Sequence, residues 1–261
     1  MNAIREPAVA GSFYPSAAGE LTDTVAALLD GVSDHTGRAP KALIVPHAGY
    51  IYSGPTAAAG YSRLQSCDDR YERVVLIGPC HQVAVSGLAA SGAEAFRTPL
   101  GDIRVDTETI ATLDLPIVEA AHRYEHSLEV HLPFLQAVLG SFELIPIVVG
   151  DATYEQVAQV LERLWGGPET LIVISSDLSH YHPYDVARAR DHKTCAAIER
   201  LDPDRIGHQD ACGAAPVGGL LLAARRHGLD VETVDLRNSG DTAGDKHHVV
   251  GYGAWAFVEN V

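Results

Sequence analysis

The fold of this chain is constrained most by four short apolar runs that are rich in β-branched residues and too short to be helices. None of them alternates apolar with polar residues, as a strand with one solvent-exposed face would. Such runs are typical of strands that are covered on both faces. They occupy residues 42–46, 73–77, 143–149 and 170–174.

The segments between these runs carry apolar residues at helical spacing. We expect helices at residues 54–65, 127–139, 153–165, 184–201 and 216–228, and a last strand at 248–258. Strand alternating with helix predicts an α/β fold, a three-layer sandwich with a central, mainly parallel sheet flanked by helices. Because no repeat or linker is visible, we expect one domain over residues 1–261, with residues 91–106 as a surface excursion.

The charge balance restricts the partners. The chain has 19 Lys and Arg against 34 Asp and Glu, a net charge of −15, which would repel nucleic acid and anionic lipid. No apolar run approaches the roughly 18 residues that cross a bilayer, and the first residues do not read as a signal peptide. We therefore expect a cytoplasmic protein that binds neither nucleic acid nor membrane. No C-x-x-C pair is present, so the four cysteines (Cys67, Cys80, Cys195 and Cys212) indicate neither a zinc knuckle nor a disulfide framework.

Polar side chains follow three of the buried runs. His47 follows the first in "PHAGY", His81 the second in "GPCHQ", and Asp177 and His180 the last in "SSDLSHY". In open α/β sheets, the loops that leave the carboxyl ends of the strands converge on one ligand-binding crevice. Imidazoles gathered there are natural ligands for a divalent transition metal, so we predict a metal site that includes His47 and His81.

A third protein ligand is needed to complete such a site. A carboxylate would complete a facial triad with open positions for substrate or dioxygen. Asp241, which lies in a glycine-rich stretch just before the last strand, is the best candidate, and Asp245 is its rival. An aspartate that makes a local turn explains either residue alone equally well.

The same segments offer residues for proton transfer. His180, or His182 two residues later, is a candidate general base, since imidazole titrates near neutral pH. Asp177 is a candidate to orient that ring, although a capping role at a helix start is an alternative. His126 and Glu129 are three residues apart and would share one face of a helix, where they are candidates to line the substrate pocket.

Several motifs in order resemble those of Memo proteins. They are "REPAVAGSFYP", "PHAGYIYSG", "GPCHQ", "TPLGDIRVD", "EHSLEVHLPF", "SSDLSHY" and "GDK", and they extend from about residue 5 to the last strand. The resemblance implies a fold similar to that of class III extradiol ring-cleaving dioxygenases, which use non-haem iron(II). His47 and His81 then match two metal-ligating histidines, and Asp177 and His180 match an Asp-x-x-His motif in which the histidine is the acid/base residue of the dioxygenase relatives.

The third ligand is where the chain departs from the animal members of the family. Those use a cysteine before the final strand, whereas no cysteine follows Cys212 here. The resemblance therefore implies that Asp241 or a neighbouring residue takes its place. A thiolate favours copper or electron-rich iron, and an aspartate favours iron(II) oxygen chemistry, so iron(II) is expected, with copper or zinc as alternatives.

Three functions remain open at this point. The first is a metal-dependent, dioxygenase-like redox enzyme that acts on a small molecule. The second is a non-catalytic module that binds a peptide or small ligand, since animal Memo proteins have been described as adaptors for phosphotyrosine peptides. The third is a zinc hydrolase. Prokaryotic relatives often occur alongside a radical-SAM protein, which implies a functional link to such a protein.

Overall fold

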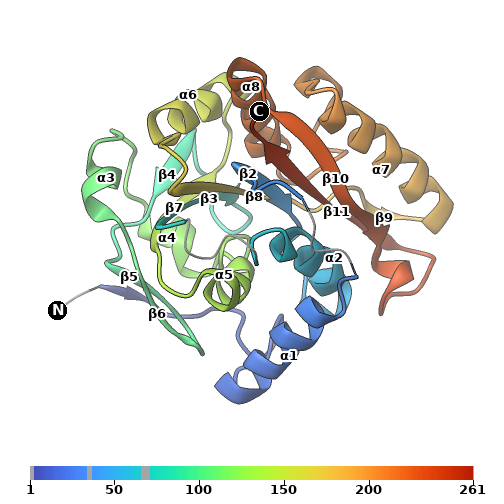
Figure 1. The fold of residues 1–261 in the computed structure, drawn as a ribbon, viewed down its shortest axis with the longest axis horizontal. Helices are drawn as coiled ribbons and strands as arrows, with labels where there is room; N and C mark the ends of the chain where they lie inside the picture. Colours follow the sequence, from blue (N-terminus) through green and yellow to red (C-terminus); the bar gives the residue numbers. More distant parts are fainter. Residues whose placement is uncertain (1–2, 34–36, 66–70, 261) are drawn as a thin grey trace.

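The computed structural model describes residues 3–33, 37–65 and 71–260, so Cys67 lies outside the described residues (Figure 1). The centre of the main sheet is a run of four parallel strands. Their order across the sheet is β2 (Ala42–Val45), β8 (Thr170–Ser175), β3 (Arg73–Pro79) and β7 (Glu143–Val149). Every residue of β2 and β8 is buried, which explains why their sequences show no alternation.

The margins of this sheet are antiparallel, so the expected mainly parallel arrangement holds for its centre alone. On one side β11 (Val249–Val258) pairs with β2, and β10 (Asp230–Asn238) pairs with β11. On the other side β4 (Leu88–Ala90) pairs with β7. A parallel pair needs a long crossover connection, and the short segment between β10 and β11 allows only the antiparallel return.

Helices cover both faces of the sheet (Figure 1). One face carries α2 (Tyr50–Ser62) and α5 (Leu132–Leu139), with α1 (Ala18–Asp30) packed outside them. The other face carries α6 (Tyr154–Leu164), α7 (Tyr184–Glu199) and α8 (Ala214–His227). The α/β fold with a sheet flanked by helices is thus confirmed, and the additional elements that the sequence did not predict include α1 and β10.

Residues 91–106, which were expected to form a surface excursion, lie outside the main sheet and form regular strands. They contain the hairpin of β5 (Ala95–Thr98) and β6 (Gly101–Arg104), which forms a three-stranded sheet with β1 (Ile4–Arg5). The buried side chains of Phe96 and Ile103 alternate with more exposed neighbours, as a half-buried hairpin requires. The segment is thus a hairpin with one buried and one more exposed face.

None of the helices in the described parts of the chain combines the length and the hydropathy that crossing a bilayer would demand.

Two histidines in the core should make the protein sensitive to acid. His122 and His131 are each 1% exposed, and burial lowers the pKa of His122 to about 4 and that of His131 well below its usual value. The unfolded chain takes up these protons near pH 6.5, whereas the folded chain does not, so stability should fall as the pH drops below that value. Between pH 7.5 and 5.5 we expect a loss of about 1 kcal/mol in the free energy of unfolding for each of the two.

Urea unfolding of the metal-free protein at both pH values measures this loss. The variant His122→Asn removes one of the two groups, so its loss over the same interval should be about 1 kcal/mol smaller than that of the unmodified chain. Equal losses in the two proteins would contradict the explanation.

Candidate metal centre and cleft

Two of the predicted histidines meet at the carboxyl edge of the sheet. His47 lies two residues beyond β2 and His81 two residues beyond β3, and β8 pairs in parallel with both strands. Neighbouring strands are about 4.8 Å apart, so side chains from β2 and β3 can reach a common point above the end of β8. The ring centroids of His47 and His81 are 5.3 Å apart. Segments that are distant in the sequence therefore supply two imidazoles to one place.

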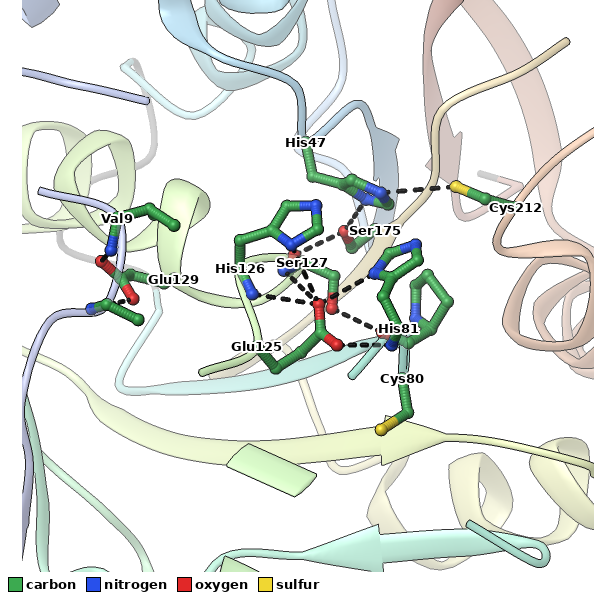
Figure 2. Close-up of polar contacts among 12 residues, drawn as sticks. Val9, His47, Cys80, His81, Glu125, His126, Ser127, Glu129, Ser175 and Cys212 are labelled. Carbon is green, nitrogen blue, oxygen red and sulfur yellow. Dashed lines mark hydrogen bonds and ion pairs between the residues drawn. The ribbon is translucent and has the colours of Figure 1, made fainter. Parts of the chain in front are cut away.

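The third ring of this cluster belongs to His126. It lies in the turn between α4 (Glu119–Arg123) and the 3₁₀ helix η2 (Glu129–His131), with its centroid 5.4 Å from that of His47 and 4.8 Å from that of His81. One nitrogen from each of the three rings can be chosen so that all lie within 4.8 Å of one another. Figure 2 shows the three side chains pointing toward one another. We call this group the histidine cluster.

The hydrogen bonds of His47 fix which of its nitrogens carries the proton. The hydroxyl of Ser175 donates its single proton to the carbonyl oxygen of Ser127 at 2.6 Å, so it can only accept from Nδ1 of His47, which lies 2.6 Å away. Nε2 therefore keeps its lone pair. In Figure 2 this atom faces Sγ of Cys212, 3.3 Å away, and burial is the main cause that raises the pKa of that thiol to about 12.

Glu125 holds the other two rings from behind the cluster. Its Oε1 accepts from Nδ1 of His81 at 2.9 Å and lies 3.3 Å from Nδ1 of His126 (Figure 2). Burial alone would raise the pKa of Glu125, but hydrogen bonds from His81 and the amide of Ser127, together with the charge of His81, lower it to about 2. The group is therefore a carboxylate that keeps a proton on Nδ1 of His81, so Nε2 is the nitrogen of this ring that would bind a metal ion. Such carboxylate contacts orient metal-binding histidines and raise their basicity.

The cluster has the chemistry of a metal site. Burial and the neighbouring rings lower the pKa of His47 well below its usual value, and burial lowers that of His126, so both rings are neutral near pH 7. Imidazole nitrogens that gather within 4.8 Å of one another fit a divalent transition metal. Within the described ranges, no other group of three or more His, Cys, Asp or Glu side chains comes together in this way.

A cleft of about 640 Å³ opens beside the cluster, and His126, Asp177 and His180 all line it. Nδ1 of His180 lies 2.8 Å from the carbonyl oxygen of Leu178, which can only accept, so Nε2 of His180 keeps its lone pair. The carbonyl oxygen of Leu178 thus orients this ring. The sequence had suggested Asp177 for this role. The carboxylate of Asp177 accepts from the amide of His47 at 2.8 Å, and burial raises its pKa.

Asp241 is not brought to the histidine cluster. Its carboxylate accepts from the hydroxyl of Tyr184 and from the amide of Asn238 at 3.0 Å, which caps the 3₁₀ helix η4 (Ser239–Asp241). This is the local turn that was the alternative interpretation of the sequence. The rival Asp245 lines the cleft without joining the cluster.

Glu129 lies away from the cleft, in the core. It is 0% exposed and accepts hydrogen bonds from the guanidinium of Arg5, the hydroxyl of Tyr14 at 2.6 Å, and the amides of Ala8 and Val9 at 2.8 and 3.0 Å. These contacts clamp residues 5–14 against η2. Ser12 and Phe13, which belong to this segment, line the cleft. Glu129 therefore positions one wall of the site without facing it.

The site also contains residues that the sequence reasoning missed. Glu125 stands next to His126 in "YEHS", and Ser175 begins "SSD", so both were within motifs already singled out. No sequence pattern predicted that Cys212 lies next to His47. It is placed there by the turn that precedes helix α8, which begins at Ala214.

The fold and the cluster define an α/β protein with a candidate three-histidine metal centre beside a cleft. Comparison with known proteins is consistent with this class. A family model described as "Memo-like protein" matches residues 5–256. The chain is 41% identical to a MEMO1 family protein of Aquifex aeolicus over 98% of this chain and 99% of that one. It is 38% identical to one of Aeropyrum pernix, covering 96% and 98%, and 37% identical to one of Ignicoccus hospitalis, covering 97% and 98%. The chain belongs to the Memo family.

Proposed function

We propose that this chain is a metal-dependent redox enzyme of the dioxygenase type, which acts on a small molecule bound in the cleft. The observation that carries the proposal is the histidine cluster itself, in which nitrogens from His47, His81 and His126 lie within 4.8 Å of one another. One of these rings, His126, also lines the cleft, so a molecule bound there would meet the ion directly. Three imidazoles leave coordination positions open for such a molecule.

Iron(II) is the ion that we propose. Imidazole suits iron, copper and zinc alike, so the donor set alone does not select among them. The resemblance of the family to class III extradiol dioxygenases supports iron(II) and the same type of fold. When bound, the ion would supply Lewis acidity toward the substrate and reactivity toward dioxygen.

The residues around the cluster would bind the substrate and move its proton. Nε2 of His180 carries a free lone pair at the cleft and would take a proton from a substrate hydroxyl. Ser175 and Glu125 would hold the rings of His47 and His81 in the binding orientation. Phe13 and Tyr252, which also line the cleft, would exclude water from the bound molecule.

Anaerobic purification without affinity-tag metals, followed by metal analysis, tests the proposal. The expected result is close to one iron per chain and dioxygen uptake with members of a panel of catechols and related phenols. The double variant His47→Ala/His81→Ala should contain no iron and consume no dioxygen. Unchanged iron content in that variant would show that the site is elsewhere.

The variant His180→Gln separates proton transfer from metal binding. A lost general base should lower kcat by about 100-fold or more while the metal content stays the same. Loss of metal from His180→Gln would instead make this residue a ligand.

A second candidate function, zinc-dependent hydrolysis, has one specific observation in its favour. Three histidines with an open position are also a ligand set of catalytic zinc. Zinc-reconstituted protein that hydrolyses aryl esters, together with an iron form that consumes no dioxygen, would support hydrolysis over the redox proposal.

A further inference from the structure

The outer part of the cleft is rich in aromatic and aliphatic side chains that solvent can reach. Tyr181 is 71% exposed, Ile51 68% and Tyr52 37%, and all three line the cleft. Exposed apolar side chains that gather at the mouth of a cavity are typical of a ligand-binding surface. This end of the cleft therefore offers rings against which a ligand can pack.

The charged groups of the cleft are acidic. Asp177 and Asp245 line it, together with the imidazoles of His126, His180 and His248, and no Lys or Arg appears among the described lining residues. Hydrogen bonds from the amides of His247 and His248 lower the pKa of Asp245, so its carboxylate is ionised at neutral pH. A cleft that combines a carboxylate with aromatic rings attracts cations and repels anions.

The backbone of Tyr181 is held in an unfavourable conformation at this mouth. Its φ is 59°, in the left-handed region that side chains rarely adopt. In strand β9 (His180–His182), the register against β11 shifts between Val249 and Val250, which leaves Tyr181 as the unpaired residue of a bulge. Bulges re-aim side chains, and this one aims Tyr181 and His180 to the cleft that both residues line. Strain retained at a ligand-facing residue points to a role in binding.

We propose that the outer part of the cleft binds an organic cation, an ammonium group carried on an aromatic body, with Asp245 as the counter-charge and Tyr52 and Tyr181 as the packing surfaces. The proposal rests on the proposed function in one respect, because it takes this cation to be the substrate of the same site. It excludes phosphorylated peptides and carboxylate-bearing molecules as preferred ligands, because the cleft offers them no cationic side chain to bind.

Two probes that share a phenol ring and differ in charge test the proposal. Tyramine carries an ammonium group and 4-hydroxyphenylacetate a carboxylate. Binding of both to the metal-free protein, measured by calorimetry at pH 8, isolates the outer part of the cleft from the ion. We expect tyramine to bind about tenfold more tightly than the carboxylate. Equal affinities, or a preference for the carboxylate, would overturn the proposal.

The variant Asp245→Asn tests the counter-charge. The preference for tyramine should drop to about threefold or less. Asp23→Asn is the matched control, since it removes an exposed carboxylate outside the cleft and should keep the full preference. A preference that survives Asp245→Asn unchanged would show that this residue does not bind the cation.

The variant Tyr181→Gly separates binding from stability. Glycine accepts a positive φ without cost, so the urea midpoint should stay the same or rise, while tyramine binding should weaken by about threefold or more. Tyr181→Phe keeps the ring and should bind normally, as should Tyr124→Ala, which removes an equally exposed tyrosine away from the cleft. Unchanged binding by Tyr181→Gly would contradict the role of the ring.

The same experiments distinguish this proposal from the redox function. The double variant His47→Ala/His81→Ala is expected to bind no metal and yet to keep the preference for tyramine. A chain that prefers tyramine but never consumes dioxygen would overturn the redox function alone. A chain that consumes dioxygen with no preference for cations would overturn the present proposal alone.

Discussion

Replacing His126 by alanine is expected to reduce the affinity for iron(II) or zinc by at least about 100-fold. His126 supplies one of three nitrogens that lie within 4.8 Å of one another, so its removal leaves two ligands and an incomplete coordination sphere. Titration of the metal-free protein with each ion, followed by a competing chelator, measures the change. The fold should be retained, because the ring of His126 is partly exposed at the cleft.

Two control variants make this prediction discriminating. Asp241→Asn should keep the metal affinity, because the carboxylate of Asp241 is engaged with Tyr184 and Asn238 outside the cluster. His227→Ala removes a histidine that pairs with Glu162 and should also bind normally. If Asp241→Asn lost its metal and His126→Ala kept it, the ligands would be His47, His81 and Asp241, as the sequence predicted. The set of three histidines inferred from the structure would then be wrong.

The variant Glu129→Gln is expected to destabilise the protein by about 3 to 5 kcal/mol. The side chains of Glu129 and Arg5 are 0% and 4% exposed, so the substitution leaves the guanidinium buried without its counter-charge. It also places an amide donor where the amides of Ala8 and Val9 and the hydroxyl of Tyr14 need an acceptor. Urea unfolding at neutral pH measures the loss.

Two comparisons test the structural reason for this effect. Glu6→Gln removes one partner of Arg97 in an exposed ion pair, and little change is expected there. The double variant Arg5→Met/Glu129→Leu removes both buried charges and should recover part of the stability. Metal affinity at low temperature should be retained by Glu129→Gln, because Glu129 does not face the cleft. If the Glu129→Gln protein were stable but no longer bound small molecules, Glu129 would have the substrate-binding role that the sequence suggested.

The sequence predicted the elements whose hydrophobic pattern is strong. The runs at 42–46 and 170–174 became β2 and β8, because strands that are buried on both faces must be apolar throughout. The meeting of His47 and His81 followed from the topology rule for parallel strands, and their rings are adjacent. These features depend on local patterns and on one general rule of connection.

The third member of the cluster could not be predicted in this way. His126 was expected to share one helix face with Glu129, but residues 124–128 turn before η2 begins, because the carboxylate of Glu125 accepts from the amides of His126 and Ser127. Asp241 lies in a glycine-rich segment in which an aspartate could equally bind a metal ion or cap a helix. Its hydrogen bonds with Asn238 and Tyr184 decide for the cap. Both outcomes depend on contacts that sequence spacing does not encode.

The position of β11 has a consequence for how the chain is synthesised and folded. This strand is made after every other strand of the main sheet, yet it lies inside the sheet between β10 and β2. Until it arrives, β2 exposes an open edge, and the cleft lacks Val250 and Tyr252 from its wall. A nascent chain therefore carries all three histidines of the cluster before the last wall of the cleft is in place, so late insertion of one strand separates assembly of the cluster from completion of the cleft.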